Sequence, residues 1–201
     1  KNEVRYQPLG VVGIIVPWNY PIFLAIGPLV AALSAGNRAM IKMSEFTPHL
    51  NKVFKEMIAE AFDENRVCVI EGEADAAIAF TEQPFDHILF TGSTTVGRFV
   101  MAAAAKNLTP VTLELGGKSP VIVSNHIPMK DAAERICFGK SMNAGQTCVA
   151  PDYILVPKAK EQEFIDAYRT AFSSMYPTLK DNGDYTAIIN ERQHRRLAAL
   201  L

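Results

Sequence analysis

The chain has 201 residues, of which 49% are hydrophobic and 20% are charged. This length is enough for one large domain, or for one domain and part of another, and the composition is ordinary for an α/β protein. The formal net charge of −1 lacks the basic surplus of proteins that bind nucleic acids or acidic lipids, so we expect no such partner. The three cysteines, Cys68, Cys137 and Cys148, suggest no disulfide framework, which favours a reducing compartment such as the cytoplasm.

One long uncharged run extends from Leu9 to Asn37. Its length is sufficient for a membrane-spanning helix. However, glycine, proline and asparagine residues interrupt the run, and its β-branched start is typical of a strand. A buried strand followed by a buried helix is therefore the better interpretation. Residues 1–7 are polar and contain no secretory signal, so we expect neither a leader nor a membrane segment.

Short apolar strands alternate with helices over the first part of the chain. Thr47 is expected as the N-cap of the second helix, with Pro48 in the first helical position. The alternation predicts βαβ units and a mainly parallel sheet. The strands are predicted at residues 11–16, 38–42, 67–70, 87–90 and 111–114, and the helices at 22–35, 47–62, 74–80 and 94–106.

After Gly117 the alternation begins again, with strands at 120–123 and 153–156 and helices at 129–142 and 160–174. Because a Gly-Gly pair lets the chain turn at low conformational cost, we expect a domain boundary at Gly116-Gly117, with domains at 1–116 and 117–201. The chain begins without Met, and a helical pattern at 190–201 still continues at Leu201. We therefore expect a piece of a longer protein.

The residues that suggest chemistry follow the predicted strands, at 17–19, 42–45, 92–97 and 114–117. In parallel sheets, ligands bind outside the carboxyl ends of the strands. The position of these residues, without any motif, therefore predicts a binding site at that edge of the sheet.

Two of these segments could bind a nucleotide. Gly92–Gly97 lies between a strand and a helix, where free N–H groups and the helix dipole could bind a phosphate. Its G-x-x-x-x-G spacing is neither the dinucleotide fingerprint nor a P-loop, so an ordinary glycine turn with an N-cap is the alternative. Lys42 and Glu45 could form hydrogen bonds with ribose hydroxyls, and a solvated charged loop is the alternative.

Cys148 lies among small and polar residues without a CxxC partner, which favours a nucleophile, with a buried structural cysteine as the alternative. Cys68 and Cys137 lie within apolar patterns and are expected in the core. Glu114 could be a general base or an ion-paired surface residue. Asn19 could donate its amide N–H to an oxyanion or stabilise its own turn. The four histidines show no metal-ligand spacing, so no metal site is predicted.

Five motifs follow one another along the chain: Pro17-Trp-Asn-Tyr-Pro21, Lys42-Met-Ser-Glu45, Phe90-Thr-Gly-Ser93, Glu114-Leu-Gly-Gly-Lys-Ser-Pro120 and Gly145-Gln-Thr-Cys148. Together they resemble the successive signatures of the aldehyde dehydrogenase superfamily, over about the whole chain. The resemblance implies that domain 1–116 is a variant Rossmann cofactor domain with a mainly parallel sheet, incomplete at its start. Domain 117–201 would be the start of an α/β catalytic domain.

The resemblance also implies a role for each motif. Cys148 would be the nucleophile, Glu114 the base, and the Asn19 side chain with the Cys148 backbone N–H the oxyanion hole. Lys42 and Glu45 would hold the adenosine ribose of NAD or NADP, and Glu45 should favour NAD because it repels a 2′-phosphate. The other cofactor-binding residues would be Trp18, Gly92, Ser93, Thr94, Thr95, Val96, Gly97, Leu115 and Gly116.

The stretch Ala150-Pro-Asp-Tyr153 resembles the branch that contains class 3 and fatty-aldehyde enzymes and bacterial coniferyl aldehyde dehydrogenases, and Gly139–Cys148 is similar to the coniferyl group. This branch implies oxidation of an aromatic or medium-chain aldehyde to the acid by a homo-oligomer, through a cysteine thioester. A CoA-acylating or phosphorylating aldehyde dehydrogenase is the alternative enzyme. A non-catalytic binding protein on the same scaffold is an alternative of a different class.

Overall fold

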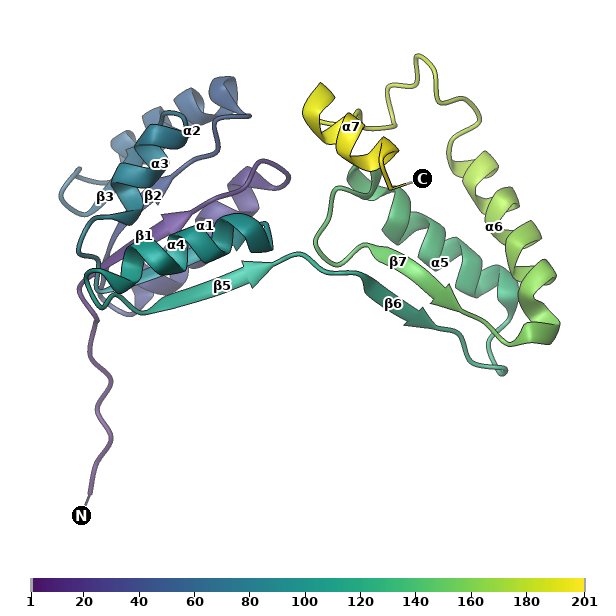
Figure 1. Ribbon diagram of the computed structural model, residues 1–201, viewed down its shortest axis with the longest axis horizontal. Coiled ribbons are helices and arrows are strands. Elements are labelled where there is room, and N and C mark those ends of the chain that lie inside the picture. The colour runs from purple at the N-terminus through teal and green to yellow at the C-terminus, as the bar shows by residue number, and fades with distance from the viewer. Residues whose placement is uncertain (1, 201) are drawn as a thin grey trace. The chain divides into compact units, whose positions relative to one another are not determined.

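The computed structural model describes residues 2–200 of the chain (Figure 1). The chain divides into two compact units, unit 1 over Lys1–Leu115 and unit 2 over Gly116–Leu201. Each unit has its own sheet and its own buried core.

Unit 1 is built on a five-stranded sheet in which every neighbouring pair of strands is parallel. The strand order is β3-β2-β1-β4-β5. The chain therefore runs outward from the central strand on one side of the sheet and continues with β4 on the other side. The expected α/β class with a mainly parallel sheet is confirmed. The strands are β1 (Val11–Ile15), β2 (Arg38–Lys42), β3 (Val67–Ile70), β4 (His87–Gly92) and β5 (Val111–Leu115).

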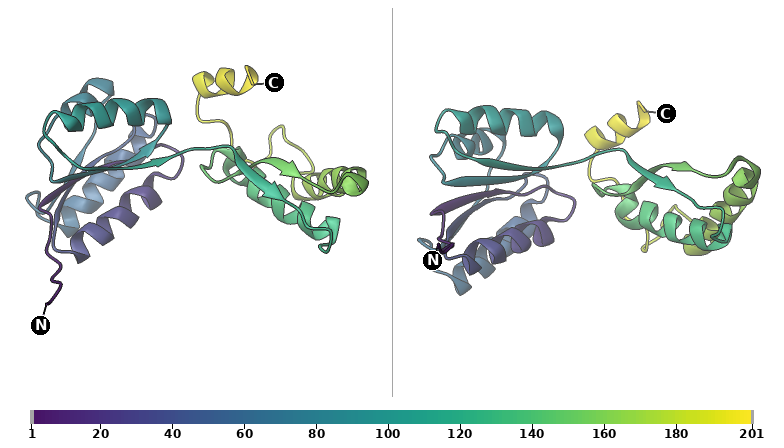
Figure 2. Two further views of the ribbon diagram at one scale, coloured as in Figure 1. Left: turned by 60° about the horizontal axis from the view of Figure 1, so that its bottom comes forward. Right: turned by 90° about the horizontal axis from the view of Figure 1, so that it is seen from below.

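Helices cover both faces of this sheet, as Figure 2 shows. On one face, Val12 and Ile14 of β1 are buried in the core to which α1 and α2 contribute, with Leu29 among its members. On the other face, α3 and α4 contribute Phe80 and Val100 to a second core. Burial on both faces explains why the strands are nearly continuous apolar runs. The helices are α1 (Pro21–Ser34), α2 (Pro48–Ala61), α3 (Ala74–Thr81) and α4 (Thr94–Ala105).

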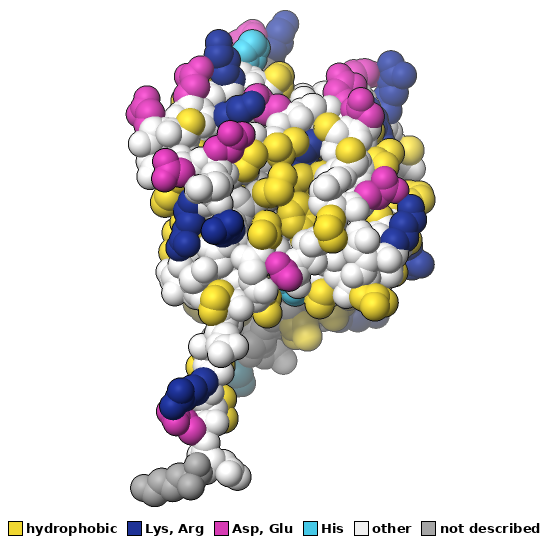
Figure 3. All heavy atoms as spheres, turned by 90° about the vertical axis from the view of Figure 1, so that its left-hand side faces the viewer, with side chains coloured by type: hydrophobic (Ala, Val, Ile, Leu, Met, Phe, Trp, Pro, Cys, Tyr) yellow, Lys and Arg dark blue, Asp and Glu magenta, His cyan; other side chains and the backbone are white. Residues whose placement is uncertain are grey.

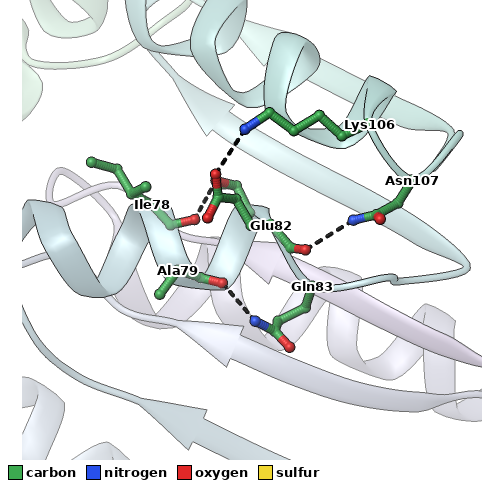
Figure 4. Close-up of polar contacts among 7 residues, drawn as sticks. Ile78, Ala79, Glu82, Gln83, Lys106 and Asn107 are labelled. Carbon is green, nitrogen blue, oxygen red and sulfur yellow. Dashed lines mark hydrogen bonds and ion pairs between the residues drawn. The ribbon is translucent and has the colours of Figure 1, made fainter.

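Glu82 ties the carboxyl-terminal ends of α3 and α4 together (Figure 4). Its Oε1 lies 2.9 Å from Nζ of Lys106, and its backbone oxygen accepts a hydrogen bond of 2.8 Å from Nδ2 of Asn107. An exposed ion pair contributes about 0–1 kcal/mol. The hydrogen bond from the side-chain amide of Asn107 satisfies a carbonyl at a helix end, where intrahelical partners are missing. These contacts hold α4 at the end opposite to its N-cap, Ser93.

Unit 2 contains two parallel strands, with α5 and α6 packed around a third core that includes Met129, Ala133 and Phe164. The predicted elements are present, displaced by one to three residues at their ends. The final helix is shorter than expected, because α7 ends at Ala198; Leu201 lies outside the described residues. The elements are β6 (Ser119–Ile122), α5 (Met129–Ser141), the 3-10 turn η1 (Met142–Gly145), β7 (Pro151–Leu155), the 3-10 turn η2 (Lys158–Lys160), α6 (Glu161–Met175) and α7 (Glu191–Ala198).

Thr47 occupies the N-cap position of α2, but its side chain accepts no hydrogen bond from the helix. The expected capping bond is therefore absent. Instead, the Thr47 hydroxyl donates to Oδ1 of Asn51 over 2.9 Å, while Nδ2 of the same asparagine donates to the backbone oxygen of Ser44 over 2.7 Å. Asn51 is buried, so its amide oxygen needs a donor, and the hydroxyl supplies one.

Cys68 is only half-buried, which corrects the expectation that it lies in the core. Side chains alternate along a strand, so Val67 and Val69 enter the core while Cys68 points to the other face of an edge strand. Its Sγ lies 3.9 Å from Oε1 of Glu64. Cys137 is fully buried, as expected.

Gly92, the last residue of β4, is required by the packing of Phe90, a core residue with 3% of its surface exposed. A Cβ on Gly92 would lie 2.5 Å from the ring carbon Cζ of Phe90. A Cβ on Gly97 would lie 3.1 Å from Cδ2 of Leu115, which is the end of a side chain that can shift. The ring of Phe90 therefore excludes a side chain at position 92, whereas a side chain at position 97 would need only a shift of Leu115.

We expect Gly92→Ala to lower the free energy of unfolding of unit 1 by about 1–3 kcal/mol, because overpacking a core forces neighbouring groups to move. Urea unfolding followed by the fluorescence of Trp18, the single tryptophan, measures this change. Gly27→Ala is the matched control: its Cβ would meet nothing within 4 Å in α1, so it should stabilise by about 0.4–1 kcal/mol. Equal stability of Gly92→Ala and the parent chain would contradict the packing argument.

Candidate active site

The register of β1 brings the candidate residues of unit 1 to one edge of the sheet. Ile15 pairs with Lys42 of β2 and with Phe90 of β4, and Gly92 pairs with Leu115 of β5. Between β1 and β4 the strand order changes direction, which is where open parallel sheets bind ligands. The predicted residues that lie at or directly after these strand ends are Trp18, Asn19, Lys42, Glu45, Gly92–Gly97, Glu114 and Leu115.

Lys42 is buried, with 2% of its surface exposed. Its Nζ donates hydrogen bonds of 2.7 Å to the backbone oxygens of Met43 and of Gly72. Burial lowers the pKa of the ammonium group, and the nearby carboxylates of Glu45 and Asp75 partly oppose that shift. The interpretation as a solvated charged loop is therefore wrong for Lys42. An ammonium group has three donors, so the two carbonyls leave one N–H for a ligand.

Glu45 is exposed in the turn that follows β2. The carbonyl of the preceding residue, Ser44, accepts hydrogen bonds from Nδ2 of Asn51 at 2.7 Å and from the backbone N–H of Thr47 at 3.3 Å. The backbone of the turn is thus held by α2 and by its N-cap residue. The carboxylate of Glu45 faces solvent on a well-anchored turn.

The segment Gly92–Gly97 forms the start of α4. Ser93 is the N-cap, and its Oγ accepts a hydrogen bond of 3.3 Å from the backbone N–H of Val96. The side chains of Ser93, Thr94, Thr95 and Val96 are exposed. The expected N-cap is present. The first turn of the helix directs N–H groups and the positive end of its dipole toward the edge of the sheet at the carboxyl ends of the strands, which we call the ligand edge.

Trp18 and Asn19 lie in the bend between β1 and α1, and both side chains are half-buried. Asn19 borders a groove of about 600 Å³ along the start of α1. Apart from Asn19 and the hydroxyl of Tyr20, the groove is formed by apolar residues, namely Pro21, Ile22, Phe23, Ile26, Gly27 and Leu50. An amide therefore lies beside an apolar surface of unit 1.

Glu114 is the fourth residue of β5, where it pairs with Thr91 of β4. Its side chain is exposed. Leu115 follows it and is the last residue of unit 1, whereas Gly116 belongs to unit 2.

Cys148 lies in unit 2, directly after a turn with unusual backbone geometry. Asn143 and Ala144 both have φ of 53°, and Gly145 has φ of 75°. A non-glycine residue in this left-handed region costs about 1–3 kcal/mol and persists only where surrounding contacts impose it. The strained turn therefore indicates that the path of the chain toward Cys148 is enforced by tertiary contacts.

A second turn presents the Cys148 side chain. The N–H of Ala150 donates to the carbonyl of Thr147 over 3.1 Å, so Cys148 and Val149 are the two central residues of a β-turn. Both are exposed, whereas Ala150 is buried and β7 begins at the next residue. The interpretation of Cys148 as a buried structural cysteine is therefore wrong. The hydrogen bond that closes this turn uses the N–H of Ala150 and not the N–H of Cys148.

Residues 1–201 match the model of the aldehyde dehydrogenase family. The chain belongs to this family. Its most similar relatives include a protein of Pseudomonas aeruginosa named "Probable coniferyl aldehyde dehydrogenase", which is 64% identical over 199 residues. The alignment covers 99% of this chain and 42% of that protein, and it confirms the coniferyl branch of the family.

Solved structures of other family members agree. The substrate-bound state of AldH from Staphylococcus aureus has a TM-score of 0.91 at 48% identity and covers 97% of this chain and 43% of that one. A Mycobacterium tuberculosis aldehyde dehydrogenase complexed with NAD+ has a TM-score of 0.86 at 37% identity, over 96% of this chain and 41% of that one. The present chain thus spans less than half the length of the family members that it matches.

Other features of this aldehyde dehydrogenase chain bear on what it can bind. Among residues 2–200, no group of His, Cys, Asp and Glu side chains has the arrangement of a metal site. No described helix is long and apolar enough to cross a membrane. On the face of the molecule in Figure 3, acidic and basic side chains are mixed.

Gln146 lies within the Gly145–Cys148 motif, and its residue type alone indicates no role. Its side chain contacts the backbone of Ala187 and Ile189, more than 40 residues later. Only its position two residues before Cys148 could have drawn attention to it. Contacts over such a separation leave no local pattern.

Because burial lowers the pKa of Lys42 below its ordinary value of 10.5, the folded state binds fewer protons than the unfolded state just below pH 10.5. Stability should therefore rise with pH in that window. We expect the free energy of unfolding of the parent, minus that of Lys42→Met, to increase as pH approaches 10.5 in urea titrations followed by Trp18 fluorescence. The matched variant Lys52→Met, at an exposed position of α2, is the control for the loss of one positive charge. A constant difference for Lys42→Met would refute the assigned burial cost.

Proposed function

We propose that the full-length protein oxidises an aldehyde to the carboxylic acid with NAD(P), through covalent intermediates on Cys148. The observation that carries the proposal is the exposed thiol on the turn Thr147–Ala150, in a chain that belongs to the aldehyde dehydrogenase family. An aldehyde has no leaving group, so the addition of a thiolate is a chemically reasonable first step. The thiohemiacetal that forms can then lose two electrons to a cofactor.

The ligand edge of unit 1 fits a dinucleotide. The N–H groups at the start of α4 suit a pyrophosphate, with Gly92–Gly97 allowing close approach, and Lys42 keeps one N–H for a ribose hydroxyl. Trp18, Leu115 and Gly116 are proposed to complete this site. When bound, the nicotinamide cofactor accepts the two electrons that leave the adduct. The exposed carboxylate of Glu45 would repel a 2′-phosphate, so we propose that NAD is preferred over NADP.

The side chains of the protein supply the rest of the chemistry. The sulfur of Cys148 bonds to the carbonyl carbon, and the resulting alkoxide is stabilised by the amide N–H of Asn19 and by the Cys148 backbone N–H. After oxidation to the thioester, Glu114 takes a proton from water, whose oxygen displaces the sulfur. Aldehyde, water and oxidised cofactor thus yield acid, reduced cofactor and one proton.

We propose an aromatic or medium-chain aldehyde as substrate. The name of the Pseudomonas aeruginosa relative supports coniferyl aldehyde, and the apolar groove beside Asn19 is compatible with a hydrocarbon group. We also propose a homo-oligomer in the cytoplasm; three free cysteines support a reducing compartment.

Asn19→Ala in the full-length enzyme should lower kcat by about 10²–10³, the usual effect of removing one oxyanion donor. Steady-state kinetics with NAD and coniferyl aldehyde measure the loss. Asn19→Asp is the matched control for shape: it keeps the size of the side chain but has no N–H, so it should lose at least as much. A loss below tenfold in either variant would remove Asn19 from this role.

Glu114→Gln should complete the first turnover and then stall, because thioester hydrolysis lacks its base. A stopped-flow trace should show about one NADH per active site, followed by a slow steady rate. Glu56→Gln, which removes an exposed carboxylate from α2, should behave as the parent. A normal steady-state rate in Glu114→Gln would refute the assignment.

The same assay tests the function itself. The parent enzyme should form acid without CoA or phosphate; a requirement for either would instead indicate an acylating or phosphorylating enzyme. No reduction of NAD or NADP with any of a broad panel of aldehydes would favour a non-catalytic protein.

A further inference from the structure

The side-chain amide of Gln146 is fully used by the backbone of two separate segments. Its Nε2 donates to the carbonyl of Asn143 over 3.0 Å and to the carbonyl of Ala187 over 3.1 Å. Its Oε1 accepts a hydrogen bond of 3.0 Å from the N–H of Ile189. Two carbonyls at one end of the amide and an N–H at the other define which atom is nitrogen. The side chain thus behaves like a peptide group paired with residues 187–189.

The first of these segments is the strained turn. The carbonyl of Asn143 also accepts the backbone N–H of Gln146 at 3.0 Å, and Nδ2 of Asn143 donates to the Gln146 carbonyl at 3.4 Å. Three hydrogen bonds therefore join residues 143 and 146 around the left-handed residues Ala144 and Gly145. These contacts are of the kind that a costly backbone conformation needs in order to persist.

The second segment ends at the start of α7. Residues 176–190 contain no regular helix or strand, and Asn190 caps α7 by accepting the N–H of Gln193 at 2.9 Å. Gln146 binds this connecting segment through hydrogen bonds to the backbone of residues 187 and 189. The cysteine loop and the entry to α7 are therefore coupled through one side chain.

The turn that carries Cys148 begins directly after Gln146. At its far end, Ala150 is buried and leads into β7. The Thr147–Ala150 turn is thus fixed at one end by Gln146 and at the other by the sheet, with the thiol exposed between them. Loss of the amide would release the first end only.

We propose that Gln146 is a positioning residue, which fixes the place of the Cys148 thiol by clamping the strained turn 143–145 to residues 187–189. The inference rests on the proposed function, since it matters to catalysis only if Cys148 is the nucleophile. It assigns Gln146 no contact with the substrate. The cofactor residues of unit 1 are not part of the clamp.

Two substitutions in the full-length enzyme separate the clamp from general stability. Gln146→Ala removes all three side-chain bonds. Gln146→Glu keeps the shape and the acceptor for Ile189, but an ionised carboxylate faces the carbonyls of Asn143 and Ala187. Protonation restores one donor, so lowering the pH toward the usual carboxyl pKa of about 4.3 should restore function. Gln162→Glu, on the exposed surface of α6, is the matched control.

We expect both Gln146 variants to lose at least tenfold in kcat, with KM for NAD within threefold of the parent. The ratio of the Gln146→Glu rate to the parent rate should rise as pH falls from 8 to 5. A kcat loss below twofold, or a ratio that does not change with pH, would overturn the proposal. Gln162→Glu should match the parent at every pH.

Hydrogen exchange provides a readout that does not depend on activity. Peptides covering 143–150 and 187–190 should exchange faster in Gln146→Ala, and in Gln146→Glu at pH 8, while α5 and β7 keep the protection of the parent. Unchanged exchange at 187–190 would refute the clamp even in an enzyme that turns over. An inactive parent would refute the proposed function alone, since the exchange comparison still decides the clamp. If Gln146→Ala fails to fold, Gln146→Glu carries both measurements.

Discussion

The parallel pairing of β1 with β2 on one side and with β4 on the other is the constraint on which unit 1 depends. Val12 and Ile14 lie in one core, while Val11 and Ile15 contact the other. A slip of one residue would exchange the two faces, so the side chains that fill each core would no longer match their neighbours in shape and size. That register places the residues after β1, β2, β4 and β5 at the same edge of the sheet. The ligand edge is therefore a consequence of how the core is packed.

The arrangement at this edge differs from the usual dinucleotide fold in an instructive way. There, the glycine-rich turn follows the central strand; here, β1 leads into Pro17 and Trp18, and the glycines follow β4. Phe90 explains the first of these glycines, because a Cβ on Gly92 would lie 2.5 Å from its buried ring. The glycines thus serve the core and leave the helix start open to solvent. Packing and ligand access are met by the same two residues.

Unit 2 solves a different problem, which is to hold one thiol on a short exposed turn. Its core of α5 and α6 against the two strands supports the far end of that turn through β7. The near end follows three left-handed residues, and Ala144 among them belongs to a type that rarely adopts this conformation. Gln146 supplies hydrogen bonds that make this path the stable one. The chemistry proposed for Cys148 thus depends on contacts made far along the chain.

The sequence by itself determined the alternation of strands and helices, the parallel α/β class and the family, because apolar periodicity and short motifs are local properties. It also located most strand and helix ends to within about two residues. Only the tertiary structure decided that Lys42 is buried, that the Thr47 hydroxyl donates to Asn51, that Cys68 is half-buried, and that Gln146 reaches residues 187–189. Each of these depends on a partner from another element, or on which face of an edge strand is covered. Such partners are set by packing between segments distant in sequence, and no window of neighbouring residues contains them.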